Sequence, residues 1–151
     1  TGDGKGNFEP VAPEKSGLVV FEDTKSLTRK DLDGDGWQDL VIGVNNGNLK
    51  VFKNNNPQGN ENSIITLAGK TGNPNAIGAK VTVQYGNGSK RIKEVQGGAG
   101  YLSQNPPTVE FSYSLENSIE SISVIWPDGN KSTHKTSEQN ELVSFKIKQP
   151  Q

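Results

Sequence analysis

The stretch that most constrains this chain runs from Asp31 to Asp39 and reads Asp-Leu-Asp-Gly-Asp-Gly-Trp-Gln-Asp. Carboxylates stand at positions 31, 33, 35 and 39, with glycines at 34 and 36. Carboxylates this close repel one another unless a cation neutralises them, and glycines allow the backbone to curl so that they converge. Ca²⁺ takes about six to eight oxygen ligands with flexible geometry. The stretch therefore predicts a calcium loop, and the alternative is a solvated acidic turn without a metal.

We expect the loop itself to provide the ligands, as side-chain carboxylates and one backbone carbonyl. These are the carboxylates of Asp31, Asp33, Asp35 and Asp39 and the carbonyl of Trp37. An EF-hand is excluded because it needs a bidentate Glu at its twelfth position, where this sequence has Ile42. The β-branched run Leu40–Val44 that follows is typical of a strand, so the loop joins strands and not helices. The indole of Trp37 is expected to pack over the loop.

The acidic loop, the turn Asn46-Gly47 and the segment Leu49-Lys50-Val51-Phe52-Lys53-Asn54 together resemble an FG-GAP/VCBS-type repeat. The resemblance implies one blade of a calcium-binding β-propeller in an extracellular protein. It places the chain outside the cell or at its surface, where Ca²⁺ is abundant. It also implies that further blades precede this one.

Composition narrows the fold class to all-β. Hydrophobic residues make up only 30% of the chain and there are 18 glycines, so short strands separated by turns are favoured over helices. The 16 basic and 17 acidic residues leave a net charge of −1, which does not favour nucleic-acid binding. No apolar run is long enough for membrane insertion, and the absence of Cys excludes disulfides.

Residues 1–56 are expected to form the partial blade and residues 57–62 a linker. Within the blade, residues 1–18 would supply a connector and an outer strand, and Leu18–Phe21 and Ser26–Arg29 would be short strands. One blade cannot bury both of its faces, because repeat architectures need neighbours. We therefore expect it to pack on upstream blades, on the rest of the chain or on a second copy. The start at Thr1, without Met, suggests a processed or trimmed piece.

Residues 63–151 are expected to form a β-sandwich. Alternation is clearest in Ala79–Tyr85, where Ala79, Val81, Val83 and Tyr85 share one face. The turn Gly86-Asn87-Gly88 returns the chain into Lys90–Gln96. Further strands are expected at Ser63–Leu67, 109–113, 121–126, Ser132–Lys135 and Leu142–Ile147, with Val143, Phe145 and Ile147 facing the core. Short strands at this spacing favour a sandwich.

This second unit resembles the ASPIC/UnbV family in three segments that occur in the family's order. They are Asn73-Pro74-Asn75-Ala76-Ile77-Gly78-Ala79-Lys80-Val81, Gly97-Gly98-Ala99-Gly100-Tyr101-Leu102-Ser103-Gln104 and Trp126-Pro127-Asp128-Gly129. The resemblance implies a transthyretin-like, or Ig-like, sandwich that follows a calcium-repeat propeller.

The loop Gly97–Gln104 has two interpretations. Its glycines could expose backbone groups to a ligand, with Tyr101, Ser103 and Gln104 as binding residues. Alternatively the loop is structural, and Tyr101 and Leu102 fill the gap between sandwich and blade. The structural role is favoured because glycine clusters usually serve backbone geometry.

No catalytic residue is predicted. His134 is the single histidine and lacks a partner in sequence, and Ser103 has no Gly-x-Ser-x-Gly context. Glu94 and Glu120 resemble ordinary surface carboxylates more than a glycosidase pair, and Trp126 is expected in the core. The interpretation is a non-enzymatic calcium-binding module that binds or scaffolds a protein or glycan. The alternative is an accessory domain of a secreted polysaccharide-active enzyme or a carbohydrate-binding module.

Overall fold

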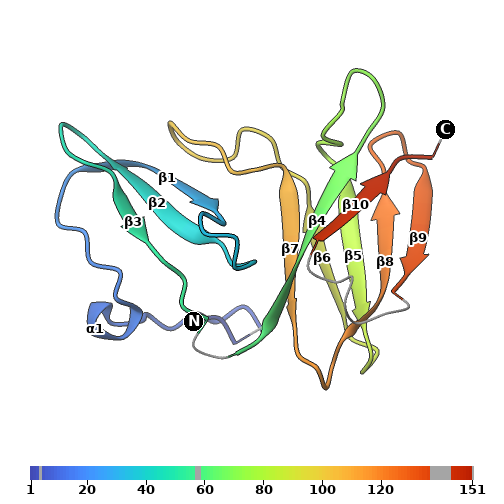
Figure 1. Cartoon of the computed structure of the whole chain (residues 1–151), viewed down its shortest axis with the longest axis horizontal. Helices are drawn as coiled ribbons and strands as arrows, with labels where there is room; N and C mark the ends of the chain where they lie inside the picture. Colours follow the sequence, from blue (N-terminus) through green and yellow to red (C-terminus); the bar gives the residue numbers. More distant parts are fainter. Residues whose placement is uncertain (4, 57–58, 137–143, 151) are drawn as a thin grey trace.

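The computed structural model describes residues 1–3, 5–56, 59–136 and 144–150. Within these ranges the chain is all-β apart from one helical turn, as predicted, and its strands form three sheets (Figure 1). The elements are α1 (Pro13–Ser16), β1 (Thr24–Lys30), β2 (Asp39–Val44), β3 (Lys50–Phe52), β4 (Glu61–Ala68), β5 (Lys80–Tyr85), β6 (Lys90–Glu94), β7 (Thr108–Tyr113), β8 (Ile119–Ile125), β9 (Lys131–Lys135) and β10 (Ser144–Lys148). No helix in the described ranges is long and apolar enough to cross a membrane.

The first sheet is an antiparallel meander in the order β1-β2-β3. Val41 of β2 pairs with Thr28 of β1 and with Val51 of β3. The acidic loop connects β1 to β2, and the hairpin from β2 to β3 turns at Asn46, whose φ is 52°. An asparagine tolerates this left-handed conformation better than most residues. The predicted strand after the loop is therefore confirmed.

Two strand predictions for this part of the chain are wrong. Neither the outer strand expected within residues 1–18 nor the short strand expected at Leu18–Phe21 is formed by the described residues. Pro13 opens the helical turn α1, a position that its fixed φ suits, and Gly17 ends the turn with a φ of 68°. The residues that follow run without a sheet partner, and Phe21 is 94% exposed. The first residue of this part of the chain that pairs in the β1–β3 sheet is Thr24, at the start of β1.

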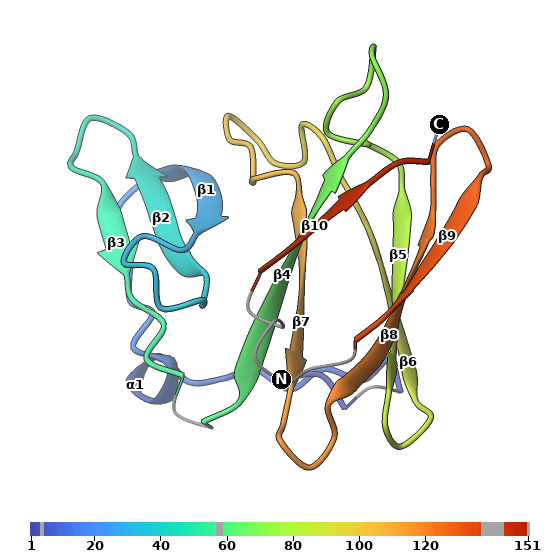
Figure 2. The same ribbon diagram turned by 45° about the vertical axis from the view of Figure 1, so that its right-hand side comes forward.

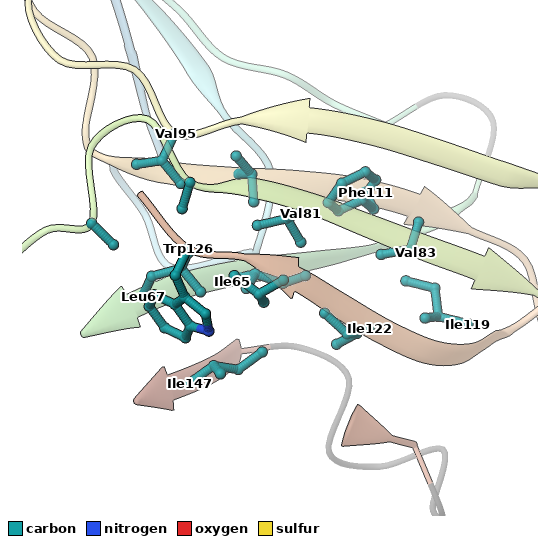
Figure 3. Packing of buried hydrophobic residues seen from close by; sticks show 14 of the residues in the cluster. Ile65, Leu67, Val81, Val83, Val95, Phe111, Ile119, Ile122, Trp126 and Ile147 are labelled. Atoms are coloured by element: carbon teal, nitrogen blue, oxygen red, sulfur yellow. The ribbon is translucent and has the colours of Figure 1, made fainter. Parts of the chain in front are cut away.

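The remaining strands form two sheets, in the orders β10-β4-β7 and β6-β5-β8-β9, which share one hydrophobic core. Figure 3 shows side chains from both sheets meeting in this core. The alternation predicted for β5 is confirmed, because Val81, Val83 and Tyr85 are all buried. Trp126 is also in the core, at 1% exposure, and its indole Nε1 donates to Ser132 Oγ at 3.0 Å.

The last strand closes the first of these two sheets. β10 runs parallel to β4, with Ile147 opposite Leu67. Ile147 is buried, and Phe145 packs against the core from a partly buried position. Leu142 and Val143, which the sequence analysis placed in this strand, lie outside the described residues.

Figures 1 and 2 show the β1–β3 sheet lying beside the two-sheet unit, which contains β4–β10. The connection between them is short, because Asn62, predicted in the linker, already belongs to β4. This brings the acidic loop close to the start of β4. The candidate site is therefore positioned by both parts of the chain.

Candidate metal centre and the contacts around it

Three carboxylates of the acidic loop converge. Side-chain oxygens of Asp31, Asp33 and Asp39 lie within 4.8 Å of one another and could hold a metal ion. Asp31 follows directly on the end of β1, and Asp39 is the first residue of β2. The pairing of these two strands therefore brings the ends of the loop together. Asp39 is only 2% exposed, so one side of the group is closed to solvent.

Backbone N–H groups orient two of these carboxylates. Asp31 accepts from the N–H of Gly34 at 2.7 Å and of Gly36 at 2.9 Å, one bond to each oxygen. Asp39 accepts from the N–H of Leu32 at 3.1 Å and of Asn54 at 2.9 Å. These bonds fix the orientation of both carboxylates, and a deprotonated carboxylate is the form that ligates a metal.

The two glycines are required by the loop's backbone. Gly34 and Gly36 have φ values of 80° and 86°, a left-handed conformation that side chains with a Cβ disfavour. This conformation allows both N–H groups to point at Asp31. The predicted role of the glycines, which was to let the backbone curl, is thereby confirmed.

A lysine from the neighbouring strand end also lies at the loop. Lys53 Nζ forms an ion pair with Asp33 and lies 3.6 Å from Asp35 Oδ2. The hydrogen bond from Lys53 lowers the pKa of Asp33, and the same contact raises the pKa of Lys53. The ammonium group thus partly neutralises this side of the loop.

Two predicted ligands are not part of the converging group. The Asp35 carboxylate accepts the N–H of Trp37 at 2.9 Å, and the three converging side chains do not include it. Asp35 and the Trp37 carbonyl therefore stay predictions as ligands. The Trp37 side chain is half-buried.

One residue that sequence reasoning missed supports the loop from the two-sheet unit. The side-chain amide of Asn62 donates to the backbone carbonyl of Gly36 at 2.7 Å, in a buried position. The residues are 26 positions apart, and no local pattern signals such a contact.

The role predicted for the loop Gly97–Gln104 is half right. Tyr101 and Leu102 are 75% and 73% exposed, so the prediction that they fill a gap is wrong. The contact with β1 is instead polar, and it comes from Gln104 and the residue after it. Thr28 Oγ1 donates to the Gln104 carbonyl at 2.9 Å, and Arg29 N donates to Asn105 Oδ1 at 2.9 Å.

Several residues of that loop have a left-handed backbone conformation. Gly98, Gly100 and Leu102 all have positive φ, at 70°, 126° and 49°. Ser103 is half-buried, and its Oγ has no hydrogen-bond partner among the described residues. Tyr101, Ser103 and Gln104 stay predictions as ligand-binding residues.

The described chain does not support a glycosidase pair. Glu94 pairs with Lys80 at one end of β5, whereas Glu120 lies beside Tyr85 at the other end. The five residue steps from Lys80 to Tyr85 span roughly 17 Å of extended strand, more than the roughly 5–9.5 Å between the carboxyl groups of such pairs. His134 is an exposed residue of β9, as expected.

Sheets, acidic loop and core together define an all-β protein with a candidate metal loop ahead of a two-sheet unit. A sequence profile of the family described as ASPIC and UnbV matches residues 69–151, and the chain belongs to this family. A second profile, of the FG-GAP-like repeat, matches residues 31–81 and includes the whole acidic loop. The order of the two predicted from the sequence is thereby confirmed.

Three relatives carry the same name. Cartilage acidic protein 1 of Mus musculus is 29% identical over 125 residues, which cover 80% of this chain and 19% of the relative. That of Homo sapiens is 32% identical over 103 residues (66% and 15%), and that of Xenopus tropicalis 31% over 112 residues (72% and 17%). The chain thus spans less than a fifth of the curated relatives that it matches.

Proposed function

We propose that this chain is a calcium-binding, non-catalytic module that binds or scaffolds a ligand outside the cell or at its surface. The observation that carries the proposal is the convergence of Asp31, Asp33 and Asp39 within the segment matched by the FG-GAP-like repeat. All donors are hard oxygens, without a His or Cys, and this donor set suits Ca²⁺.

Each carboxylate has a distinct task in this proposal. Asp39 offers an almost fully buried oxygen at the start of β2, and Asp31 offers one that two backbone N–H groups hold in place. Asp33 is exposed and must exchange its contact with Lys53 for the ion. A bound Ca²⁺ would neutralise the like charges of the loop. It would thereby tie the end of β1 to the start of β2.

The finer architecture is also a proposal. We infer that residues 1–56 form a propeller blade, 57–62 a linker and 63–151 a transthyretin-like or Ig-like sandwich. Leu49, just before β3, and Val51 of β3 are 67% and 58% exposed, which suits a neighbouring blade or a second copy packing on this sheet. The ligand of the module would be a protein or a glycan.

Calcium titration of the metal-stripped chain by calorimetry tests the proposal. We expect one site in the unmodified chain and a loss of affinity of at least about tenfold in Asp33→Asn, which removes one charged ligand. Asp3→Asn is the matched control, because Asp3 is an exposed aspartate outside the converging group. Mg²⁺ should bind weakly, since it demands strict octahedral geometry. Equal affinities in the two variants would contradict the assignment.

Thermal unfolding gives an independent measure of the same site. A ligand that binds only the folded chain stabilises it by RT ln(1 + [L]/Kd), or about 2.7 kcal/mol at a hundredfold excess over Kd. EDTA should therefore lower the melting temperature of the unmodified chain, and it should lower that of Asp33→Asn by a smaller amount. A melting temperature of the unmodified chain that ignores both EDTA and Ca²⁺ would mean that the loop binds no calcium in solution.

A further inference from the structure

A crevice lies between the β1–β3 sheet and the two-sheet unit. It consists of two hollows, of about 560 and 890 Å³, that share Trp37, Asn54 and Ser112 in their walls. Volumes of this order are typical of ligand sites, which often form between domains. We propose that this crevice binds an acidic polysaccharide. The inference names the ligand class for the proposed binding role and depends on that role.

Positive charge predominates in the crevice. Among the described residues, the cationic side chains in its walls are those of Lys15, Arg29, Lys53, Arg91 and Lys93, and the one carboxylate is that of Glu110. Glu110 lies 3.9 Å from Arg29, and Lys53 is paired with the acidic loop. The other three have no carboxylate within 4 Å in the described part of the chain, so an anionic ligand would find unpaired cations.

Two of these unpaired cations stand on the same face of β6. The Arg91 guanidinium lies 5.7 Å from the centre of the Tyr85 ring, and Lys93 Nζ lies 5.5 Å from that of Phe111. Partial burial lowers the pKa of Lys93, and the nearby charges of Arg29 and Arg91 lower it further, against the opposite effect of Glu110. The cations therefore repel one another here, and an acidic group bound among them would relieve the repulsion.

The uncharged part of the walls favours a sugar over an acidic peptide. Asn54 accepts a backbone N–H through its side-chain carbonyl, and Asn117 does the same, which leaves both amide NH₂ groups as donors. Hydroxyls of Ser89 and Ser112 line the same hollow. Amides and hydroxyls match the many hydroxyl groups of a sugar. The half-buried Trp37 presents an apolar ring with an N–H donor, which suits the flat face of a pyranose.

Binding of defined polymers to the full chain tests this proposal by calorimetry at low salt. The probes are an oligogalacturonide with carboxylates, a heparin-derived oligosaccharide with sulfates, a neutral maltooligosaccharide, poly-glutamate and inorganic sulfate. We expect one or both acidic saccharides to bind, and the two arms distinguish carboxylate from sulfate recognition. The maltooligosaccharide, poly-glutamate and inorganic sulfate should bind at least about tenfold more weakly.

Variants separate this site from general charge attraction. Arg91→Gln with Lys93→Gln should weaken saccharide binding at least about tenfold, because charge-assisted hydrogen bonds are lost. Trp37→Ala should weaken it as well. Lys131→Gln with Lys135→Gln is the charge-matched control on the exposed strand β9 and should bind like the unmodified chain. Lys15→Gln, on the exposed turn α1, gives a second test remote from the core.

Three results would overturn the proposal. They are tighter binding of poly-glutamate than of any saccharide, equal losses in the β6 and β9 variants, and saccharide binding that is absent or indifferent to Trp37→Ala. Calcium titration of the β6 variant keeps the two proposals apart. An unchanged calcium site with no saccharide binding would overturn this inference and leave the metal site intact.

Discussion

The side-chain amide of Asn62 donates a hydrogen bond of 2.7 Å to the backbone carbonyl of Gly36. Asn62 is 6% exposed at the start of β4, and Gly36 is buried in the acidic loop. The loop that holds the candidate metal ligands is thus fixed by a side chain of the two-sheet unit, although the loop itself belongs to the β1–β3 sheet. One side chain therefore links the candidate metal loop to the two-sheet unit.

Asn62→Ala should lower both stability and calcium affinity. It leaves a buried carbonyl without its partner, at a cost of about 1–3 kcal/mol in the free energy of unfolding. The freed loop must then also be ordered when calcium binds, which weakens binding. Urea unfolding and calcium calorimetry measure the two effects, with Asn48→Ala, in an exposed turn, as the control. Identical values for the two variants would show that the Gly36 contact does not support the loop.

Gly69→Ala should destabilise the two-sheet unit by about 1–3 kcal/mol, a typical cost of overpacking. A Cβ at Gly69 would lie 2.2 Å from the Asn73 carbonyl oxygen and 3.1 Å from the Ala76 nitrogen. Both are backbone atoms, so no side chain can rotate away. Gly86→Ala is the control, because its Cβ would meet nothing closer than 3.7 Å. Thermal unfolding should separate the two variants by several degrees.

Local patterns predicted the strands and the acidic loop because both are encoded by nearby residues. Alternation identified β5, whose Val81 and Val83 are fully buried, and the spacing of carboxylates and glycines identified the loop. The contact between Asn62 and Gly36 could not be predicted in this way. It depends on how two distant segments pack, and sequence periodicity does not contain that information.

The errors have the same origin. Leu18–Phe21 has the composition of a strand, but a strand needs a partner, and no partner pairs with it in the described chain. Tyr101 and Leu102 are large apolar residues in a polar loop, and burial was the natural expectation. Both side chains are instead mostly exposed, in a loop where Gly98, Gly100 and Leu102 have positive φ.

The carboxylate of Asp128 should stabilise the two-sheet unit at neutral pH and lose this effect in acid. Its carboxylate accepts from Lys70 Nζ at 3.0 Å and from Gln149 Nε2 at 2.8 Å. The bond from Lys70 is the main cause that lowers the pKa of Asp128 below its ordinary 3.8, and Asn130 contributes as well. The folded chain thus binds this proton less readily than the unfolded chain.

The sign of the effect follows by linkage. A lowered pKa stabilises the fold above pH 3.8, and the contribution disappears as the pH falls through the lower folded value. Asp128→Asn should therefore melt below the unmodified chain at pH 7. The two melting temperatures should approach each other as the pH falls below about 3.8. A difference that stays constant over this range would show that the charge of Asp128 contributes nothing.

Asn105→Ala should loosen the edge of β1, whereas Tyr101→Ala should not. Asn105 Oδ1 accepts from Arg29 N at 2.9 Å and from Thr28 Oγ1 at 3.3 Å. Arg29 lies on an edge strand, so its N–H loses this partner when Asn105 is truncated, and its hydrogen exchange should become faster. Tyr101 is 75% exposed, so its truncation should leave the exchange of Arg29 unchanged. Both variants should exchange normally at Val81 and Val83, inside the core. Faster exchange at Arg29 in Tyr101→Ala, with no change in Asn105→Ala, would restore the aromatic contact expected from the sequence and remove the polar one.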